Sequence, residues 1–280
     1  MRDNSKRTSA AANPAPAVAS QDMASQLVFS TPTELVDLPS KGRLYPEGHP
    51  LHNAETVEIK FMTAKDEDIL TSPSLLKKGL AITRFLQNIL IDKSINVGSL
   101  LSGDKNAILI AARVNGFGSD YRTKVTCPNC ATVSENTFDL DAVENYDGLD
   151  FEGYDIRDTG RGTFIIKLPK SGFDVEVKPM TSREEDELLQ SMSSKRKIGH
   201  ETNLTDQLRK VIVSINGVED ATIISQAIAH MPAYDSRYVR SAYAKVIPAP
   251  DMTQHFACPS CGFEKEVDIP MTVDFFWSKQ

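Results

Sequence analysis

The chain has 280 residues, of which 40% are hydrophobic, and its formal net charge is −7 at pH 7. That length and apolar content suffice for one large or two modest domains with a buried core. The sequence has no run of about eighteen apolar residues, which argues against a membrane-spanning helix. The acidic balance argues against a protein that gains its affinity from nucleic-acid phosphates.

The N-terminal part of the chain has the composition of a tail followed by a loop. Residues 1–28 are rich in Ala, Ser, Pro, Asn and Gln and have no apolar run that could act as a signal sequence. We therefore predict a disordered tail on a protein made in the cytosol. The prolines of residues 29–52 favour an extended loop. His49 and His52 in this loop are interpreted as exposed turn residues.

A strand followed by an acidic helix occurs twice in the chain. Val57 to Leu70 reads VEIKFMTAKDEDIL and Val175 to Leu188 reads VEVKPMTSREEDEL, with eight of fourteen positions identical and four conservatively exchanged. Thr63 with Asp66, and Thr181 with Glu184, have the spacing of a helix N-cap and its capping box. The neighbouring acidic residues fall in the first helical turn, where the helix dipole favours negative charge. We interpret them as capping residues and not as catalytic carboxylates.

Further helices follow in the same order in both copies. Apolar residues at helical spacing predict amphipathic helices over 82–90 and 204–215, and an additional one over 223–231. A later helix is predicted to begin with Asp104 as its N-cap in the first copy, and its counterpart to begin near Asp235. A β-hairpin is predicted over 163–178.

These patterns predict an α+β fold built by tandem duplication of a unit containing a strand, helices and a cysteine knuckle. The order of elements is the same in both copies, and self-similarity of this kind determines how the whole fold is assigned. The predicted organisation is a tail over 1–28, a first repeat over 29–150 and a second repeat over 151–280. Each repeat contains one cysteine knuckle.

The chain has four cysteines, all of them in two Cys-Pro-x-Cys pairs: Cys127, Cys130, Cys258 and Cys261. Two cysteines separated by two residues can supply two corners of a tetrahedral zinc site. The pairs lie far apart in the sequence, but the duplication would give each repeat half of a site. We therefore predict one structural Zn²⁺ that joins the two halves in a zinc-ribbon-like site.

Other interpretations of the cysteines stay open at this stage. In one, two separate half-sites are each completed by another chain. In another, the cysteines form disulfides, which a reducing compartment disfavours. In the third, they form a redox pair, which would require the Cys-x-x-Cys to open a helix. His255 is a further candidate ligand, but its position three residues before Cys258 directs it off the strand. A closed site of four sulfurs would leave no position for substrate. The sequence also lacks a phosphate-binding glycine loop and the common hydrolase motifs, so we predict no enzymatic activity.

Several long motifs together resemble the baseplate hub protein family of T-even-like contractile-tailed bacteriophages. The resemblance implies a non-enzymatic assembly protein of the tail baseplate hub, present in the host cytoplasm during assembly and then in the virion. It implies other tail and hub proteins as partners, with the tape-measure protein as a further candidate, and neither nucleic acid nor membrane. The motifs are Leu38-Pro-Ser-Lys-Gly42, Leu44-Tyr-Pro-Glu-Gly-His-Pro50, Val57 to Ser72, Asp92-Lys-Ser-Ile-Asn96, Gly103 to Arg113 and Cys127-Pro-Asn-Cys130.

Two other functions are kept as alternatives. A tail assembly chaperone that acts on the tape-measure protein would be absent from the finished particle. A zinc-ribbon adaptor that binds nucleic acid has paired knuckles as precedent, but the acidic balance of the chain argues against it.

Overall fold

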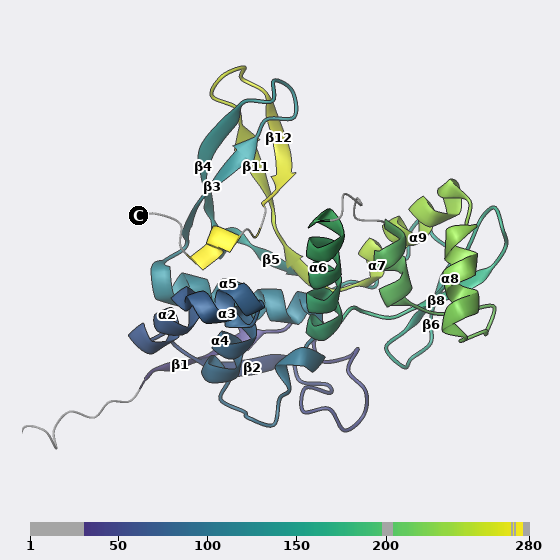
Figure 1. The fold of residues 1–280 in the computed structure, drawn as a ribbon, viewed down its shortest axis with the longest axis horizontal. Coiled ribbons are helices and arrows are strands. Elements are labelled where there is room, and N and C mark those ends of the chain that lie inside the picture. Colours follow the sequence, from purple (N-terminus) through teal and green to yellow (C-terminus); the bar gives the residue numbers. More distant parts are fainter. Residues whose placement is uncertain (1–30, 198–203, 270, 272, 277–280) are drawn as a thin grey trace, which may run out of the picture. The chain divides into compact units, whose positions relative to one another are not determined.

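The computed structural model of the protein describes residues 31–197, 204–269, 271 and 273–276. The chain divides into two units, residues 1–32 and residues 33–280. The predicted tail, residues 1–28, lies outside the described residues. In the second unit, helices alternate with short antiparallel strands (Figure 1), which confirms the α+β class.

The strands of the described residues form small antiparallel sheets. β1 pairs with β2, β3 with β4, β5 with β10 and β11 with β12, whereas β6, β7, β8 and β9 form one four-stranded sheet in that order. The strands are β1 (Thr33–Asp37), β2 (Thr56–Lys60), β3 (Asp120–Thr126), β4 (Val133–Asp139), β5 (Glu144–Tyr146), β6 (Ile156–Asp158), β7 (Phe164–Lys167), β8 (Asp174–Val177), β9 (Ile212–Ile215), β10 (Ala249–Asp251), β11 (Thr253–Ala257) and β12 (Glu264–Asp268).

The helices pack around a core that runs through both halves of the chain. Fully buried side chains include Phe85, Tyr121, Phe164 and Phe256. The helices are α2 (Ala64–Thr71), α3 (Pro73–Lys78), α4 (Ala81–Ile89), α5 (Ser102–Phe117), α6 (Ser182–Lys197), α7 (Leu204–Val211), α8 (Ala221–Ala229) and α9 (Ala233–Val246), with 3-10 turns η1 (Val97–Ser99), η2 (Leu140–Ala142) and η3 (Val273–Phe276).

The predicted capping boxes are confirmed at the start of α2 and α6. Asp66 accepts hydrogen bonds from the Thr63 backbone N–H (3.0 Å) and hydroxyl (2.6 Å). Glu184 accepts a hydrogen bond from the Thr181 N–H (3.0 Å), and the Glu184 N–H donates to the Thr181 hydroxyl (3.4 Å). Asp66 and Glu184 therefore act as capping residues, because they accept hydrogen bonds from backbone N–H groups that the start of a helix leaves unpaired.

The predicted helix over 204–215 is wrong in its second part. The helix α7 ends at Val211, and Ile212–Ile215 forms strand β9, which pairs with β8. The apolar spacing fits either structure, but the run Ile-Val-Ser-Ile is rich in β-branched residues, which favour a strand. The predicted strand 56–60, hairpin 163–178 and helix 223–231 correspond to observed elements.

The assignment of Asp104 as an N-cap is also wrong. The helix α5 begins at Ser102, so Asp104 lies inside its first turn, and Asp235 has the same position in α9. Both side chains are buried. Asp104 accepts hydrogen bonds from the Ser40 N–H (3.0 Å) and hydroxyl (2.6 Å). Asp235 accepts from the N–H groups of residues 170 (2.9 Å) and 171 (2.8 Å).

These two aspartates hold turns that are alike in sequence and in place. Leu38-Pro-Ser-Lys-Gly42 follows β1, and Leu168-Pro-Lys-Ser-Gly172 follows β7. In each half the strand before this turn pairs with the strand that leads into the capped helix, β2 or β8. The correspondence between the halves therefore extends beyond the fourteen-residue repeat.

The two halves contact each other through backbone and side-chain bonds. β5 pairs with β10. Ser102 N–H donates to the Met180 carbonyl (2.9 Å), and Ser182 N–H donates to the Leu100 carbonyl (2.7 Å). Residues 33–280 form one compact unit by their contacts. The division of this unit into repeats near residue 150 stays a prediction.

The 3-10 turn η3 packs on the first half of the chain. Phe275 and Phe276 are buried in η3, with edge-to-face ring contacts to Tyr121 (5.1 Å) and Phe85 (5.3 Å), respectively. Arg113 donates to the carbonyls of Phe275 (3.0 Å) and Gly118 (2.6 Å). These contacts attach η3 to α5 and to the base of the β3–β4 hairpin.

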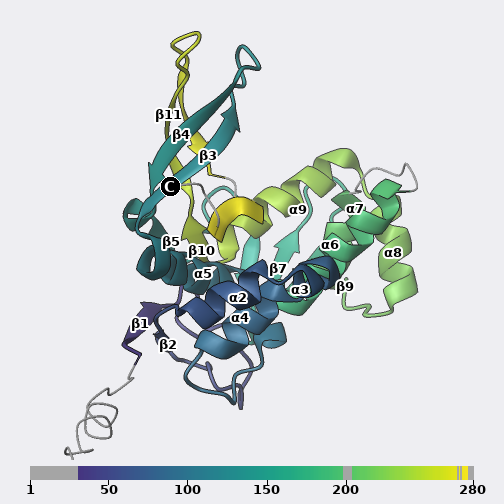
Figure 2. The same ribbon diagram turned by 60° about the vertical axis from the view of Figure 1, so that its left-hand side comes forward.

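Two hairpins extend together from the helices. β3–β4 and β11–β12 lie side by side and end in turns that meet at their far tips (Figure 1, Figure 2). We call this pair of hairpins the arm. Apolar side chains are buried along its length, with Tyr121 and Phe138 at its base and Phe256 two residues before the Cys258 turn. The arm brings the two Cys-Pro-x-Cys turns together.

Candidate metal centre

The first cysteine pair lies in the turn between β3 and β4. The Cys127 N–H donates to the Thr132 carbonyl (2.9 Å), and the Ala131 N–H donates to the Cys127 carbonyl (2.9 Å). Pro128 fixes one backbone angle of the turn. Ala131 has a positive φ of 58°, a conformation that is unfavourable for any residue with a Cβ. The turn presents Cys127 and Cys130 to the same side.

The second cysteine pair lies in an equivalent turn between β11 and β12. The Cys258 N–H donates to the Phe263 carbonyl (2.8 Å), and the Gly262 N–H donates to the Cys258 carbonyl (3.0 Å). Gly262 corresponds to Ala131 and has a φ of 65°. Glycine adopts this conformation without a steric penalty. The two turns therefore have the same geometry but differ in the residue that takes the left-handed position.

The four sulfur atoms form one cluster at the tip of the arm. All four lie within 4.8 Å of one another. Two distances connect the hairpins: 3.8 Å between the Sγ atoms of Cys127 and Cys261, and 3.7 Å between those of Cys130 and Cys258. A tetrahedral zinc with Zn–S bonds of about 2.3 Å has sulfur–sulfur separations of about 3.8 Å. All four cysteines are free thiols, and the cluster has the size and shape of a four-sulfur metal site.

The surroundings of Cys130 favour its thiolate, which is the form of cysteine that binds metal. Thr132 Oγ1 lies 3.3 Å from Cys130 Sγ. Hydrogen bonding by the Thr132 hydroxyl and backbone, and by Cys261, lowers the pKa of Cys130 to about 6. The Asn129 side-chain amide donates toward the Cys261 sulfur at 3.6 Å. Cys127 and Cys258 are buried, and Cys130 and Cys261 are exposed.

The chain was compared with protein families, curated proteins and solved structures. Residues 31–157 match the family described as T4 bacteriophage base plate protein. This segment is less than half of the chain, and its match supports a T4-like phage base plate protein. The searches of curated proteins and of solved structures gave no match. The matched segment contains Cys127 and Cys130, whereas Cys258 and Cys261 lie outside it.

The match of this segment supports a structural role in the phage tail and contact with other tail proteins. No helix in the described part of the base plate protein is long and apolar enough to cross a membrane. The resemblance to base plate proteins that the sequence motifs indicated is thus confirmed for the first half of the chain.

His255 is not part of the sulfur cluster of the base plate protein. It lies on β11, its side chain is 58% exposed, and its Nδ1 is 3.6 Å from a carboxylate oxygen of Glu266 on β12. The four cysteines are the residues that the fold brings together as possible metal ligands. The prediction that His255 points away from the knuckle agrees with this arrangement.

His49 is more deeply placed in the base plate protein than the sequence predicted. Its ring stacks on Tyr45 at 4.3 Å, and its Nε2 lies 2.8 Å from Ser99 Oγ. The Leu51 N–H donates to His49 Nδ1 (3.1 Å), so the proton of the neutral ring is on Nε2 and is donated to Ser99. Burial lowers the pKa of His49, which favours this neutral form. In this tautomer His49 holds the loop and does not accept the Ser99 proton.

Sequence reasoning missed the residues that surround the sulfurs. Thr132 and Asn129 lie within or next to the first knuckle, so their closeness to sulfur could have been inferred from the short turn. The pairing of His49 with Ser99 joins positions 50 residues apart. No local pattern in the sequence of the base plate protein indicates that contact.

Proposed function

We propose that this protein is a non-enzymatic structural component of the base plate hub of a contractile phage tail, and that one structural Zn²⁺ holds its arm together. The observation that carries the proposal is the cluster of four free cysteine sulfurs, two from each half of the chain, at separations suited to a tetrahedral metal ion. The family match supports the base plate role. The assignment to the hub is supported by the motif resemblance alone.

The proposed ligands are Cys127, Cys130, Cys258 and Cys261. Four thiolates in a tetrahedral arrangement are the donor set of a closed structural zinc site. Bound there, Zn²⁺ would link the two hairpins without offering a coordination position to substrate. Structural zinc supplies on the order of 10 kcal/mol of apparent folding free energy. The metal would therefore connect the tips of the two hairpins directly.

We further propose that the two halves arose by tandem duplication. The support is the shared order of a Leu-Pro-x-x-Gly turn, a capped helix, a buried aspartate in a later helix and a knuckle. One test gives the second turn the Ser and Lys of the first turn, because Lys170 is exposed whereas Ser40 is buried. If the halves are equivalent, the variant K170S/S171K should fold and unfold cooperatively, with a loss no larger than that of one hydrogen bond, about 1 kcal/mol.

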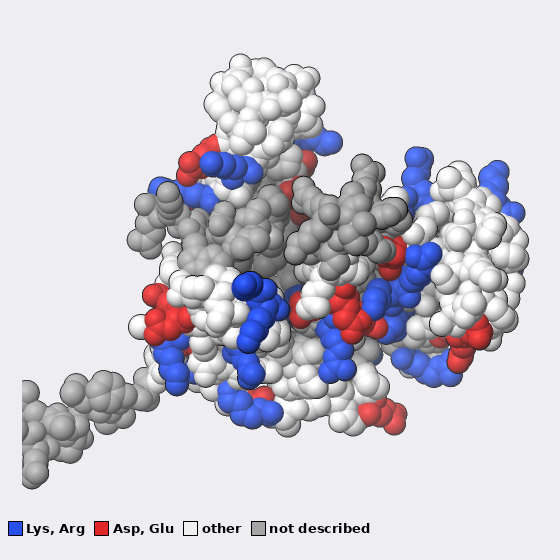
Figure 3. All heavy atoms as spheres, viewed as in Figure 1, with Lys and Arg blue, Asp and Glu red and all other residues white. Residues whose placement is uncertain are grey.

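The surface of the arm argues against the nucleic-acid adaptor. Residues 127–134 and 256–263 contain no Lys, Arg, Asp or Glu, and Figure 3 shows the corresponding tip without charged side chains. Behind this tip, the strands β3, β4, β11 and β12 contain six acidic residues and three basic ones, Arg122, Lys124 and Lys265. Binding to phosphates requires a basic surface, whereas acidic residues outnumber basic ones on the arm.

The proposal is tested by purifying the protein from infected cells and from finished virions. One zinc per chain with sulfur alone in its first shell, measured by X-ray absorption, is the expected result. An oxygen or nitrogen ligand in the first shell, or a protein that binds no metal, would contradict the clamp. Proteomics of purified virions distinguishes the two assembly roles, because a hub component remains in the tail and a tape-measure chaperone does not.

A further inference from the structure

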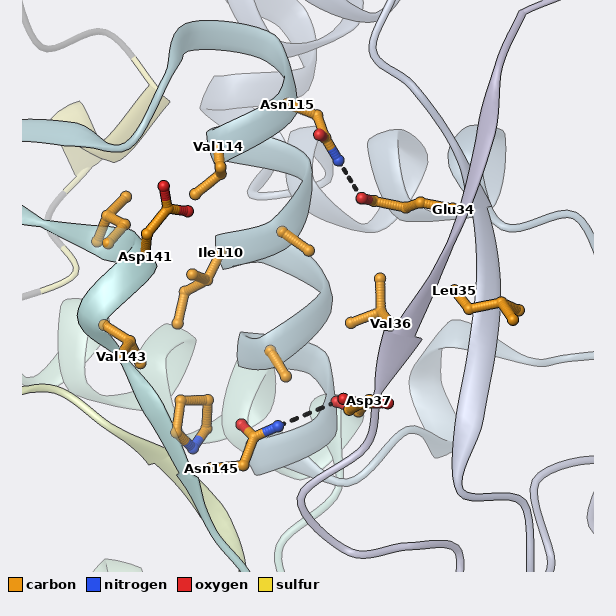
Figure 4. A pocket seen from close by; sticks show the side chains of 14 residues that line it. Glu34, Leu35, Val36, Asp37, Ile110, Val114, Asn115, Asp141, Val143 and Asn145 are labelled. Atoms are coloured by element: carbon orange, nitrogen blue, oxygen red, sulfur yellow. Dashed lines mark hydrogen bonds between the residues drawn. The ribbon is translucent and has the colours of Figure 1, made fainter.

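A groove is lined by β1, α5, the segment from η2 to β5 and Pro250 of β10 (Figure 4). Its volume is about 310 Å³. Four successive residues of β1, Glu34 to Asp37, contribute to the lining. Side chains of a strand alternate between its two faces, so a pocket on one face alone would be lined by every second residue. The groove therefore also reaches the edge of β1.

That edge of β1 is open for pairing. Among the residues that the structure describes, β2 is the strand that pairs with β1. The Leu38 N–H donates to the Glu55 carbonyl in the same ladder (2.8 Å), so by the alternation of an antiparallel pair the backbone groups of Leu35 point away from β2. The Asp37 carbonyl has this outward direction as well, because it accepts a hydrogen bond from the Asn145 side chain at 3.2 Å. An unpaired strand edge is a template for an added strand.

The floor of the groove is apolar and made partly of small residues. The small side chains of Ala107 and Ala111 on α5 leave room for a ligand in the groove. Ile110, Val114 and Val143 lie on either side of this room (Figure 4). Asparagine side chains cross the groove near its two ends, where Asn115 donates to the Glu34 carboxylate and Asn145 to the Asp37 carbonyl. The groove thus offers an apolar pocket beside a free strand edge, which is the arrangement that strand-adding peptides use.

The rim of the groove is negatively charged. Its lining includes Glu34, Asp37 and Asp141 and contains no Lys or Arg. A second copy of this chain that paired through β1 would bring Glu34 and Asp37 against their own equivalents, and like charges across a strand pair are destabilising. A partner strand with lysine or arginine beside its apolar residues would instead complement the rim.

We propose that this groove binds an extended, basic segment of another base plate protein, which adds to β1 as a strand and places an apolar side chain over Ala107 and Ala111. The inference rests on the proposed assembly role for the existence of such a partner. The preference of the groove itself depends only on the residues that line it, and it is tested on the isolated protein.

The test measures binding of labelled peptides to the full chain by fluorescence anisotropy. One peptide alternates lysine with valine, and its control alternates glutamate with valine. The lysine peptide should bind more tightly by on the order of tenfold, with a difference that shrinks as salt is added. Ala111→Phe should abolish binding by filling the pocket. The double variant D37K/D141K should reverse the preference between the peptides.

Leu35 provides the matched pair of variants for the strand edge. Leu35→Ala keeps the outward N–H and should bind the lysine peptide within a few-fold of wild type, whereas Leu35→Pro removes that N–H and should weaken binding by on the order of tenfold. Equal binding by these two variants, equal binding of the two peptides, or self-association through β1 would overturn the proposal. A groove that binds as expected in a protein missing from virions would refute the assembly role and leave the groove intact.

Discussion

In each half of the molecule a buried aspartate binds the same kind of turn, but the pKa of the aspartate is raised in one half and lowered in the other. Asp104 in α5 and Asp235 in α9 are both buried and both accept hydrogen bonds from a Leu-Pro-x-x-Gly turn. Burial raises the pKa of Asp104, and the hydrogen bonds from Ser40 offset this only in part. Burial also raises the pKa of Asp235, but the hydrogen bonds from Ser171 and Lys170 outweigh it and lower the pKa.

The difference shows that an equivalent backbone position does not fix the electrostatics of the residue that occupies it. Asp104 lies beside the buried Tyr45, whose pKa burial raises strongly, and Asp104 adds to that rise. Asp235 faces two backbone N–H groups, and Lys170 also contributes to the lowering. The neighbouring residues thus decide whether the ionised form of an aspartate at this position is destabilised, as in Asp104, or stabilised, as in Asp235.

The largest test of the comparison replaces one buried cysteine in each half. If one metal ion is shared, Cys127→Ser and Cys258→Ser should each abolish stoichiometric zinc binding and lower the melting temperature by the same amount. Loss of the metal removes a stabilisation on the order of 10 kcal/mol. Metal analysis and calorimetry provide the readout, and chelation of wild type should reproduce the effect. His255→Ala is the control and should keep the zinc. Two separate half-sites would instead leave part of the zinc bound in each variant.

A second test uses corresponding positions at which the halves differ in packing. A Cβ on Gly103 would lie 2.1 Å from the Pro248 carbonyl oxygen, so Gly103→Ala forces α5 away from the chain leading into β10. We expect a loss of about 1–3 kcal/mol, as for other overpacked sites. Tyr234 is the matching residue of α9 and is 57% exposed. Tyr234→Ala removes a cation–π contact with Lys170, whose Nζ lies 5.4 Å from the ring centroid, and should cost no more than about 1 kcal/mol. Urea denaturation measures both variants.

A third test follows the pH dependence of Asp104→Asn and Asp235→Asn. Asp235 has a lowered folded pKa, so its contribution is present above the unfolded value of 3.8 and is lost as the pH falls through the folded pKa. Asp104 has a raised folded pKa, so stability at this site falls as the pH rises from 3.8 through the folded pKa. The destabilisation by Asp235→Asn, about 1–3 kcal/mol near neutral pH, should therefore shrink in acid.

The destabilisation by Asp104→Asn should instead grow as the pH falls through the same range. Urea denaturation of each variant beside wild type at each pH isolates the carboxylate, because acid affects the cysteine cluster of both proteins alike. Parallel pH profiles of the two variants would show that both carboxylates are perturbed in the same direction.

The smallest expected effect concerns the left-handed residue of each knuckle. Ala131→Gly should stabilise the protein by about 0.5–1 kcal/mol because it removes a Cβ at positive φ. Gly262→Ala should cost about as much, since a Cβ there would meet no atom within 4 Å and the penalty is conformational. Urea denaturation of the metal-loaded proteins tests both. The same sign for the two variants would contradict the equivalence of the turns.

The sequence predicted those parts of the fold whose causes are local. The capping residues Thr63 and Thr181 and the turns at Cys127 and Cys258 depend on neighbours within a few positions, and all of them are where the pattern indicated. The clustering of the four sulfurs required the additional hypothesis of duplication. The sulfur positions agree with that hypothesis, although the identity of the metal and the descent of the halves are still proposals.

The features that sequence reasoning missed depend on distant contacts. Asp104 looked like an N-cap because aspartate is common there, but its partner is Ser40, 64 residues earlier. Ile212–Ile215 has apolar spacing compatible with a helix, and pairing with β8 makes it a strand. The groove beside β1 combines residues of four separate segments, so neither its volume nor its charged rim could be predicted from any one of them.

The distribution of the cysteines also sets an order of events during synthesis. Cys258 is translated 131 residues after Cys127 and leaves the ribosome later by the same interval. At bacterial elongation rates this interval lasts on the order of ten seconds. Until then the nascent chain carries two unpartnered thiols, and the arm closes only as the last part of the polypeptide emerges. A prematurely terminated product would therefore retain an open hairpin with reactive sulfur at its tip.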